Sequence, residues 1–180
     1  MNKPRNAHES GFTLIEMMTT LIIMVIVLSI AIPSFVVWLP NYRLSSAARD
    51  LFSNMQQAKM GAIQANGTYK IVFFNPDAQS YIIQDNTGAT IKTVNFVNYG
   101  SNITYGNGSA TNSYDGAAFG DFVSYVSDAS SNDNEAAFTS RGLAKTGYVY
   151  LANEKNTAYV VGSQSSGVIM MRKWINGDWQ

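Results

Sequence analysis

The sequence predicts an α+β protein in which one long N-terminal helix, half transmembrane and half amphipathic, packs against antiparallel β-sheet. Two observations predict this class. An apolar run passes directly into a segment with helical periodicity, and β-branched and aromatic segments between Gly- and Asn-rich turns fill the remainder. The 180 residues leave room for one compact domain with an appendage. We therefore divide the chain into a leader, a transmembrane half-helix, an amphipathic half-helix and a β region, at residues 1–11, 12–39, 40–66 and 67–180.

The leader is short and polar, and it precedes the apolar run. An ordinary secretory signal instead places its apolar region before the cleavage site. Cleavage after Gly11 would leave the hydrophobic segment on the mature protein. Lys3 and Arg5 precede that segment, so the positive-inside rule predicts a cytoplasmic N-terminus and puts residues 41–180 on the opposite side of the membrane.

The apolar segment 12–39 is longer than the ~20 residues that a helix needs to cross a bilayer core. A plain signal-anchored protein with one transmembrane helix would explain this length, but it does not explain Glu16. A carboxylate in a spanning helix costs ~2.5–3.5 kcal/mol at depth unless it is paired. After cleavage the nearest partner is the new α-amino group of Phe12, either in the same chain or in a staggered neighbouring copy. Pairing between copies would neutralise both charges and fix the register between subunits.

Four residues carry a resemblance to the class III signal of type IV pilins and pseudopilins. They are Gly11 before the cut, Phe12 at the new terminus, Glu16 as the fifth mature residue and Pro33 within GFTLIEMMTTLIIMVIVLSIAIP. The resemblance implies cleavage by a prepilin peptidase, N-methylation of Phe12 and assembly through the helix. Pro33 removes a helical hydrogen bond, and it resembles the site where a pilin helix bends or melts inside the filament. A tolerated transmembrane proline is an equal alternative on sequence alone.

Beyond Pro40 a narrow apolar stripe recurs at alternating spacings of four and three, which is typical of an amphipathic helix. Arg49, Asp50 and Asn54 lie off this stripe. Asn66-Gly67 is a left-handed stop signal, so we expect the helix to end there. The stripe consists of Leu44, Ala48, Leu51, Met55, Ala58, Ala62 and Ala65.

Past Gly67 the pattern indicates a meander of antiparallel strands, forming one or two sheets packed on the amphipathic half-helix. A looser stretch rich in Gly, Asn, Ser and Asp runs between residues 99 and 135 and is expected to be a long loop. The predicted strands are Tyr69–Phe74, Ser80–Asp85, Ile91–Val97, Ala136–Ser140, Gly147–Ala152, Thr157–Ser163 and Gly167–Trp174.

The C-terminal pattern FTSRGLAKTGYVYLA…TAYVVGSQSSGVIMM is similar to the end of the GspH/FimT family of minor pilins and pseudopilins. The matching positions are Phe138, Gly142, Tyr148–Leu151 and Gly167. In the DNA-binding members of this family a glycine of the last hairpin is followed by arginines, as G-R-x-R. Here Gly167 is followed by Val, Ile and Met, so that motif is absent.

A small basic-aromatic site for nucleic acid would have to come from later residues of the last strand. Arg172, Lys173 and Trp174 supply the residue types, and a solvated strand end is the alternative interpretation. The part of the chain beyond Pro40 carries ten basic and ten acidic residues, a balance that argues against a general polyanion binder.

Several chemistries are excluded by composition. The chain has no cysteine, and its one histidine, His8, lies in the leader. Disulfides, thiolate catalysis and imidazole-based triads or metal sites are therefore not available to the mature protein. The acidic stretch 127–135 offers Asp128, Asp133 and Glu135 as hard oxygen ligands that suit calcium, but it lacks the EF-hand glycine, and a solvated loop is the better interpretation.

These observations predict a non-enzymatic minor pilin or pseudopilin without cofactor or metal. The expected partners are other pilins, the prepilin peptidase and an inner-membrane assembly platform, and the expected location is the bacterial inner membrane followed by a pilus or secretion pseudopilus. Two rivals are a DNA-binding competence pilin and a signal-anchored periplasmic enzyme. The sequence does not choose between pilus and pseudopilus, or between the tip and the shaft of the filament.

Overall fold

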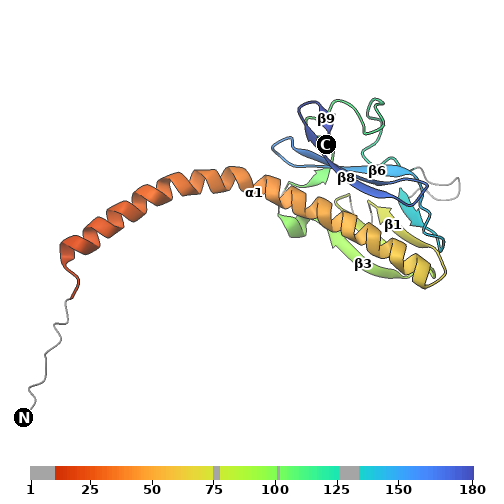
Figure 1. Ribbon diagram of the computed structural model, residues 1–180, viewed down its shortest axis with the longest axis horizontal. Coiled ribbons are helices and arrows are strands. Elements are labelled where there is room, and N and C mark those ends of the chain that lie inside the picture. The colour runs from red at the N-terminus through yellow and green to blue at the C-terminus, as the bar shows by residue number, and fades with distance from the viewer. Residues whose placement is uncertain (1–10, 75–77, 101, 126–133) are drawn as a thin grey trace, which may run out of the picture. The chain divides into compact units, whose positions relative to one another are not determined.

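The computed structural model describes residues 11–74, 78–100, 102–125 and 134–180. It divides into two compact units, residues 1–38 and 39–180. Helix α1, Leu14–Gln64, passes through both, and the second unit adds short strands and one 3-10 helix (Figure 1). These elements are β1 Tyr69–Phe73, β2 Ser80–Gln84, β3 Thr90–Asn95, η1 Phe96–Tyr99, β4 Thr104–Tyr105, β5 Glu135–Phe138, β6 Gly147–Ala152, β7 Ala158–Ser163, β8 Ile169–Ile175 and β9 Asp178–Trp179. The α+β class predicted from the sequence is confirmed.

The strands form two antiparallel sheets. The first has the order β3-β2-β1-β5 and the second the order β4-β6-β7-β8-β9. The expected meander is therefore interrupted twice. β5 returns to pair with β1, with Tyr69 opposite Phe138, and β4 pairs with β6, with Thr104 opposite Ala152. Part of the predicted loop 99–135 thus belongs to sheet structure, because β4 adds an outer strand to the second sheet.

The main core lies where the second half of α1 meets both sheets. It contains the apolar stripe of the helix together with side chains such as Phe73 and Tyr81 from the first sheet and Leu151 and Val161 from the second. Small residues on the helix let the sheets approach closely, since Ala48 and Ala62 are fully buried. Burial of the stripe is what holds the amphipathic half of the helix on the β domain.

Two details of the predicted stripe are wrong. Ala65 is exposed, because the helix ends at Gln64, one residue before it. Asn54, expected to lie off the stripe, is completely buried. Its side-chain amide donates to the Tyr81 hydroxyl at 2.6 Å, and its oxygen accepts from Lys92 Nζ at 2.9 Å. A buried amide with both partners satisfied is compatible with a core, and the network ties α1 to β2 and β3.

The helix stop at Asn66 is confirmed. Asn66 adopts a left-handed conformation with φ 47°. The Gly67 N–H donates to the Ala62 carbonyl at 3.0 Å, and the Asn66 N–H donates to the Ile63 carbonyl at 3.3 Å. These two bonds form a Schellman motif, which satisfies carbonyls that the end of the helix would otherwise leave unpaired.

A second aromatic cluster covers the outer face of the second sheet. Tyr150 and Trp179 are buried there, and Phe119 and Trp174 pack against them. The Trp179 indole N–H donates to the Asn112 carbonyl at 3.0 Å, and the Tyr114 N–H donates to the Tyr150 hydroxyl at 2.8 Å. The segment after β4 therefore packs on the outer face of the second sheet together with Trp179 of β9, the last strand of that sheet, an arrangement that the sequence analysis did not predict.

Candidate functional site at the start of the helix

The predicted cleavage position lies just outside α1. Residues 11–13 are not helical, and the helix begins at Leu14. The Thr13 carbonyl accepts from the Glu16 N–H at 3.1 Å and from the Met17 N–H at 3.2 Å, so the hydrogen-bond ladder starts at Thr13. Phe12 is 76% exposed, and an added Cβ at Gly11 would meet no atom within 4 Å. Gly11 and Phe12 are therefore exposed and lie outside the helix.

Glu16 has a partner within its own chain. The Glu16 N–H donates to Thr13 Oγ1 at 3.3 Å, and Glu16 Oε2 accepts from the Thr13 N–H at 3.4 Å. This reciprocal pair is a capping box, with Thr13 as the N-cap and Glu16 three residues on. The carboxylate also lies in the first turn, where the helix dipole favours negative charge. The T-x-x-E signature of this capping box is present in the sequence.

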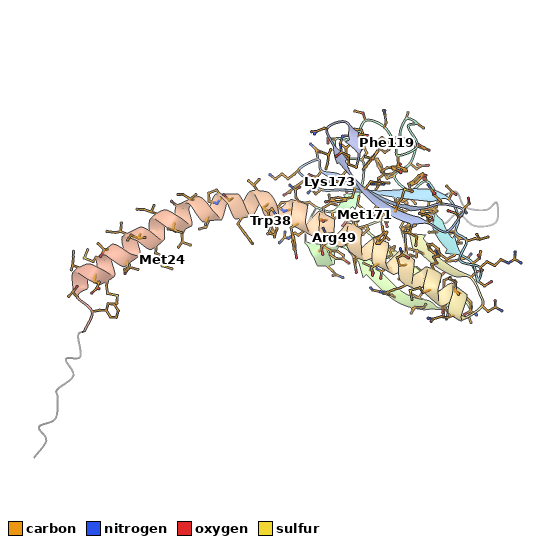
Figure 2. The ribbon with its side chains drawn as sticks, viewed as in Figure 1. Met24, Trp38, Arg49, Phe119, Met171 and Lys173 are labelled. Atoms are coloured by element: carbon orange, nitrogen blue, oxygen red, sulfur yellow. The ribbon has the colours of Figure 1, made fainter. Side chains whose placement is uncertain are left out.

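The first half of α1 exposes a continuous apolar surface. Apolar side chains from Leu14 to Val37, including Met24, project from the helix and are exposed (Figure 2). Within the part of the chain that the structure describes, α1 is the helix long and apolar enough to cross a membrane, with a mean hydropathy of 2.8 over its most apolar window and none of that window buried. An apolar surface of this extent requires lipid or other protein as its neighbour.

Pro33 lies inside this apolar half, and α1 is helical on both sides of it. Having no N–H, Pro33 leaves the Ser29 carbonyl without its usual helical donor. The Ser29 hydroxyl donates a hydrogen bond to the Ile26 carbonyl at 2.7 Å, and the Ser34 hydroxyl donates one to the Ile30 carbonyl at 3.3 Å. Melting or bending at Pro33 in an assembled filament stays a prediction.

The structure does not bring the three residues of the possible nucleic-acid site together. Side chains alternate along β8, so Lys173 lies on the face opposite to Arg172 and Trp174. The ammonium of Lys173 lies 5.9 Å from the Tyr159 ring centre, and Trp174 packs edge-on against Trp179 at 5.1 Å. Of the three, Arg172 is exposed, whereas Lys173 and Trp174 are half-buried. Nucleic-acid binding at this strand end stays a prediction.

The calcium hypothesis falls largely outside the described residues, because Asp128 and Asp133 belong to the segment 126–133. Glu135 is described, and it forms an ion pair with Lys70 at 3.0 Å between β5 and β1. Its carboxylate is thus used in joining two strands. No group of three or more His, Cys, Asp or Glu side chains in the described ranges could hold a metal ion.

The described residues show structural polar networks instead of catalytic ones. Burial raises the pKa values of the Tyr81 and Tyr125 hydroxyls, which keeps both neutral. Tyr125 shares a 2.8 Å hydrogen bond with Ser163, and the Tyr99 hydroxyl donates to the Asp50 carboxylate. An open groove of about 280 Å³ lies between Ala58 on α1 and Ile91 on β3. Neither network places a nucleophile beside a base in a cavity.

The N-terminal segment and the fold both resemble known proteins. Residues 6–32 match the sequence model described as the prokaryotic N-terminal methylation motif. No curated protein matches the sequence. Among solved structures, the type IV minor pilin FimU of Pseudomonas aeruginosa resembles the chain in two crystal forms. One has a TM-score of 0.50 at 14% identity, covering 78% of this chain and 94% of FimU, and the other a TM-score of 0.46 at 13% identity, covering 76% and 97%.

The chain thus carries a prepilin-type signal and has a pilin-like fold, a long helix packed on antiparallel sheets. The motif includes Gly11, Phe12 and Glu16, the residues at the exposed start of α1. Its apolar helix and motif together indicate membrane anchoring. The assignment to the GspH/FimT family stays a prediction.

Proposed function

We propose that this chain is a minor pilin or pseudopilin, processed after Gly11 and assembled through α1 into a type IV pilus or a secretion pseudopilus. One observation carries the proposal: the methylation motif lies at the start of an exposed apolar helix whose second half holds a pilin-like β domain. A helix that serves only as an anchor needs neither that motif nor a carboxylate in its first turn.

Processing would create the charge that assembly needs. Cleavage after Gly11 releases an α-amino group on Phe12, which N-methylation leaves cationic. Glu16 Oε2 already holds the Thr13 N–H of its own chain, and the carboxylate has room for further donors. In the apolar environment of packed helices, pairing of Glu16 with the Phe12 terminus of a neighbouring subunit would remove two unpaired charges together and fix the axial register.

The proposed partners follow from this path. Before processing, the leader would lie in the cytoplasm, the apolar first half of α1 would cross the inner membrane, and the β domain would lie in the periplasm. The prepilin peptidase would act first, an assembly platform would extract the subunit, and other pilins would cover the apolar half of α1. The β domain would then lie on the filament surface or at its tip, without catalytic activity.

The processing step is tested by co-expressing the full chain with a prepilin peptidase in bacterial cells and measuring the mass of the membrane-bound product. We expect loss of residues 1–11, with the product retained in the membrane fraction. Gly11→Val is the matched control, because it enlarges the side chain next to the scissile bond and should block cleavage while leaving insertion intact. A chain cut elsewhere, or released from the membrane, would contradict the proposal.

A further inference from the structure

The cleavage position and the start of the helix are set by neighbouring residues. Thr13 is the N-cap, and its carbonyl is the first acceptor of the ladder, so the Gly11 carbonyl stays outside it. In a helix, a backbone carbonyl is engaged with the N–H four residues on and is shielded by the surrounding side chains. Peptidases cut exposed, non-helical chain far more readily.

Without the cap at Thr13, the helix could start at another residue, and the Gly11 carbonyl would then take part in the helical hydrogen bonds. Glycine is acceptable as an N-cap, about as good as threonine, whereas Val and Ala are poor. If the cap moved from Thr13 to Gly11, Phe12 would become the first helical residue. The Gly11 carbonyl, which belongs to the scissile bond, would then accept from the Ile15 N–H. A shift of two residues would therefore change the segment around the scissile bond from non-helical to helical.

We infer that Thr13 is a positioning residue for leader removal: its capping box with Glu16 stops α1 short of the Gly11–Phe12 bond and keeps that bond outside the helix for the peptidase. The inference rests on the proposed processing after Gly11. It assigns Glu16 a task in the precursor, as the reciprocal partner of the cap, in addition to its proposed pairing in the filament.

The test compares Thr13→Val with Thr13→Ser and Thr13→Asn in the full-length precursor. Valine keeps the β-branched shape and loses the hydroxyl, whereas serine and asparagine differ in shape but both cap well. The precursors, in detergent micelles with a prepilin peptidase, are followed by the mass change on leader loss. The backbone conformation of Phe12 is measured by NMR in the uncut precursor, without peptidase, from the ¹³Cα chemical shift of Phe12. The Phe12→Leu variant identifies that signal, because the signal is missing from its spectrum.

We expect about fivefold slower cleavage of Thr13→Val, from the typical loss of an N-cap, with Thr13→Ser and Thr13→Asn close to wild type. The Phe12 shift should move toward helical values in Thr13→Val only. Cleavage of Thr13→Val at the wild-type rate, slow cleavage of all three variants, or an unchanged Phe12 shift would overturn the inference. An uncut wild-type chain would overturn the proposed processing, and the inference with it.

Discussion

The buried amide of Asn54 gives a quantitative test of how the helix is held on the β domain. Asn54 and Tyr81 are both completely buried, and their 2.6 Å hydrogen bond links α1 to β2. Asn54→Leu would leave the Tyr81 hydroxyl without this donor, and a buried unsatisfied polar group costs about 1–3 kcal/mol. Lys92 would also lose its acceptor, but its side chain can turn to water at little cost. We therefore expect Asn54→Leu to lower the free energy of unfolding by about 2 kcal/mol.

The double variant Asn54→Leu/Tyr81→Phe shows whether the two side chains stabilise the fold as a coupled pair. Tyr81→Phe should cost about 1 kcal/mol by itself, yet the double variant should cost little more than that, because removing both partners leaves no unsatisfied group. The assay is urea unfolding of the full chain in detergent micelles, followed by the fluorescence of Trp174 and Trp179, which lie in the β domain. Losses that simply add in the double variant would refute the network as a coupled unit.

Three further predictions concern the β domain. Gly167→Ala should destabilise this domain by about 2–4 kcal/mol, because φ is 80° and the new Cβ would overlap the Gly142 carbonyl oxygen. Gly177→Ala is the control: its φ is 87° but the space around it is open, so it should cost only the ~1–2 kcal/mol of backbone strain. The urea midpoints of the two variants are compared. The free energy of unfolding should fall above pH 10, the ordinary pKa of tyrosine, because burial raises the pKa of Tyr125 in the folded state, so that the unfolded chain binds fewer protons than the folded chain there. Tyr125→Phe should make this fall with pH less steep. Lys70→Met should lower stability by removing the partner of Glu135, which is mostly buried, and an unchanged urea midpoint would show that water replaces the pair.

Local signals predicted the regular elements well. The bounds of β6 were predicted correctly, because Gly147 and the residues after Ala152 are turn-forming and the residues between them are apolar or aromatic. The end of α1 was predicted within two residues, since Asn66 adopts the left-handed conformation that asparagine tolerates better than most residues. Segments whose conformation is decided by neighbours in sequence are the ones that a single sequence reveals.

Long-range pairing was not predictable from the same information. The return of β5 to β1 joins residues far apart in the chain, and nothing local in Glu135–Phe138 specifies that neighbour. β4 and β9 have two residues each, too short to show alternation. Asn54 looked like a surface residue because its burial depends on Tyr81 and Lys92 supplying hydrogen bonds.

Some features of the candidate site were predicted from the sequence and others were missed. Gly11, Phe12 and Glu16 were identified from a linear motif, and the structure places them together at the exposed start of α1. The capping function of Thr13 was missed, although its signature lies in the sequence. Arg172 and Lys173 lie on opposite faces of β8, and the predicted strand Gly167–Trp174 already implied this alternation, which the sequence analysis did not apply to the possible nucleic-acid site.

The most direct test of the proposed function is the incorporation of Glu16→Gln beside wild-type subunits in the filaments of a host with the complete assembly system. Glutamine keeps the capping box but removes the charge, so processing should be normal while the neighbour's Phe12 terminus loses its counter-ion. We predict complete leader removal, normal membrane insertion and at least a severalfold lower ratio of variant to wild type in sheared filaments than in membranes. An equal ratio in both fractions would contradict the role of the Glu16 charge in assembly.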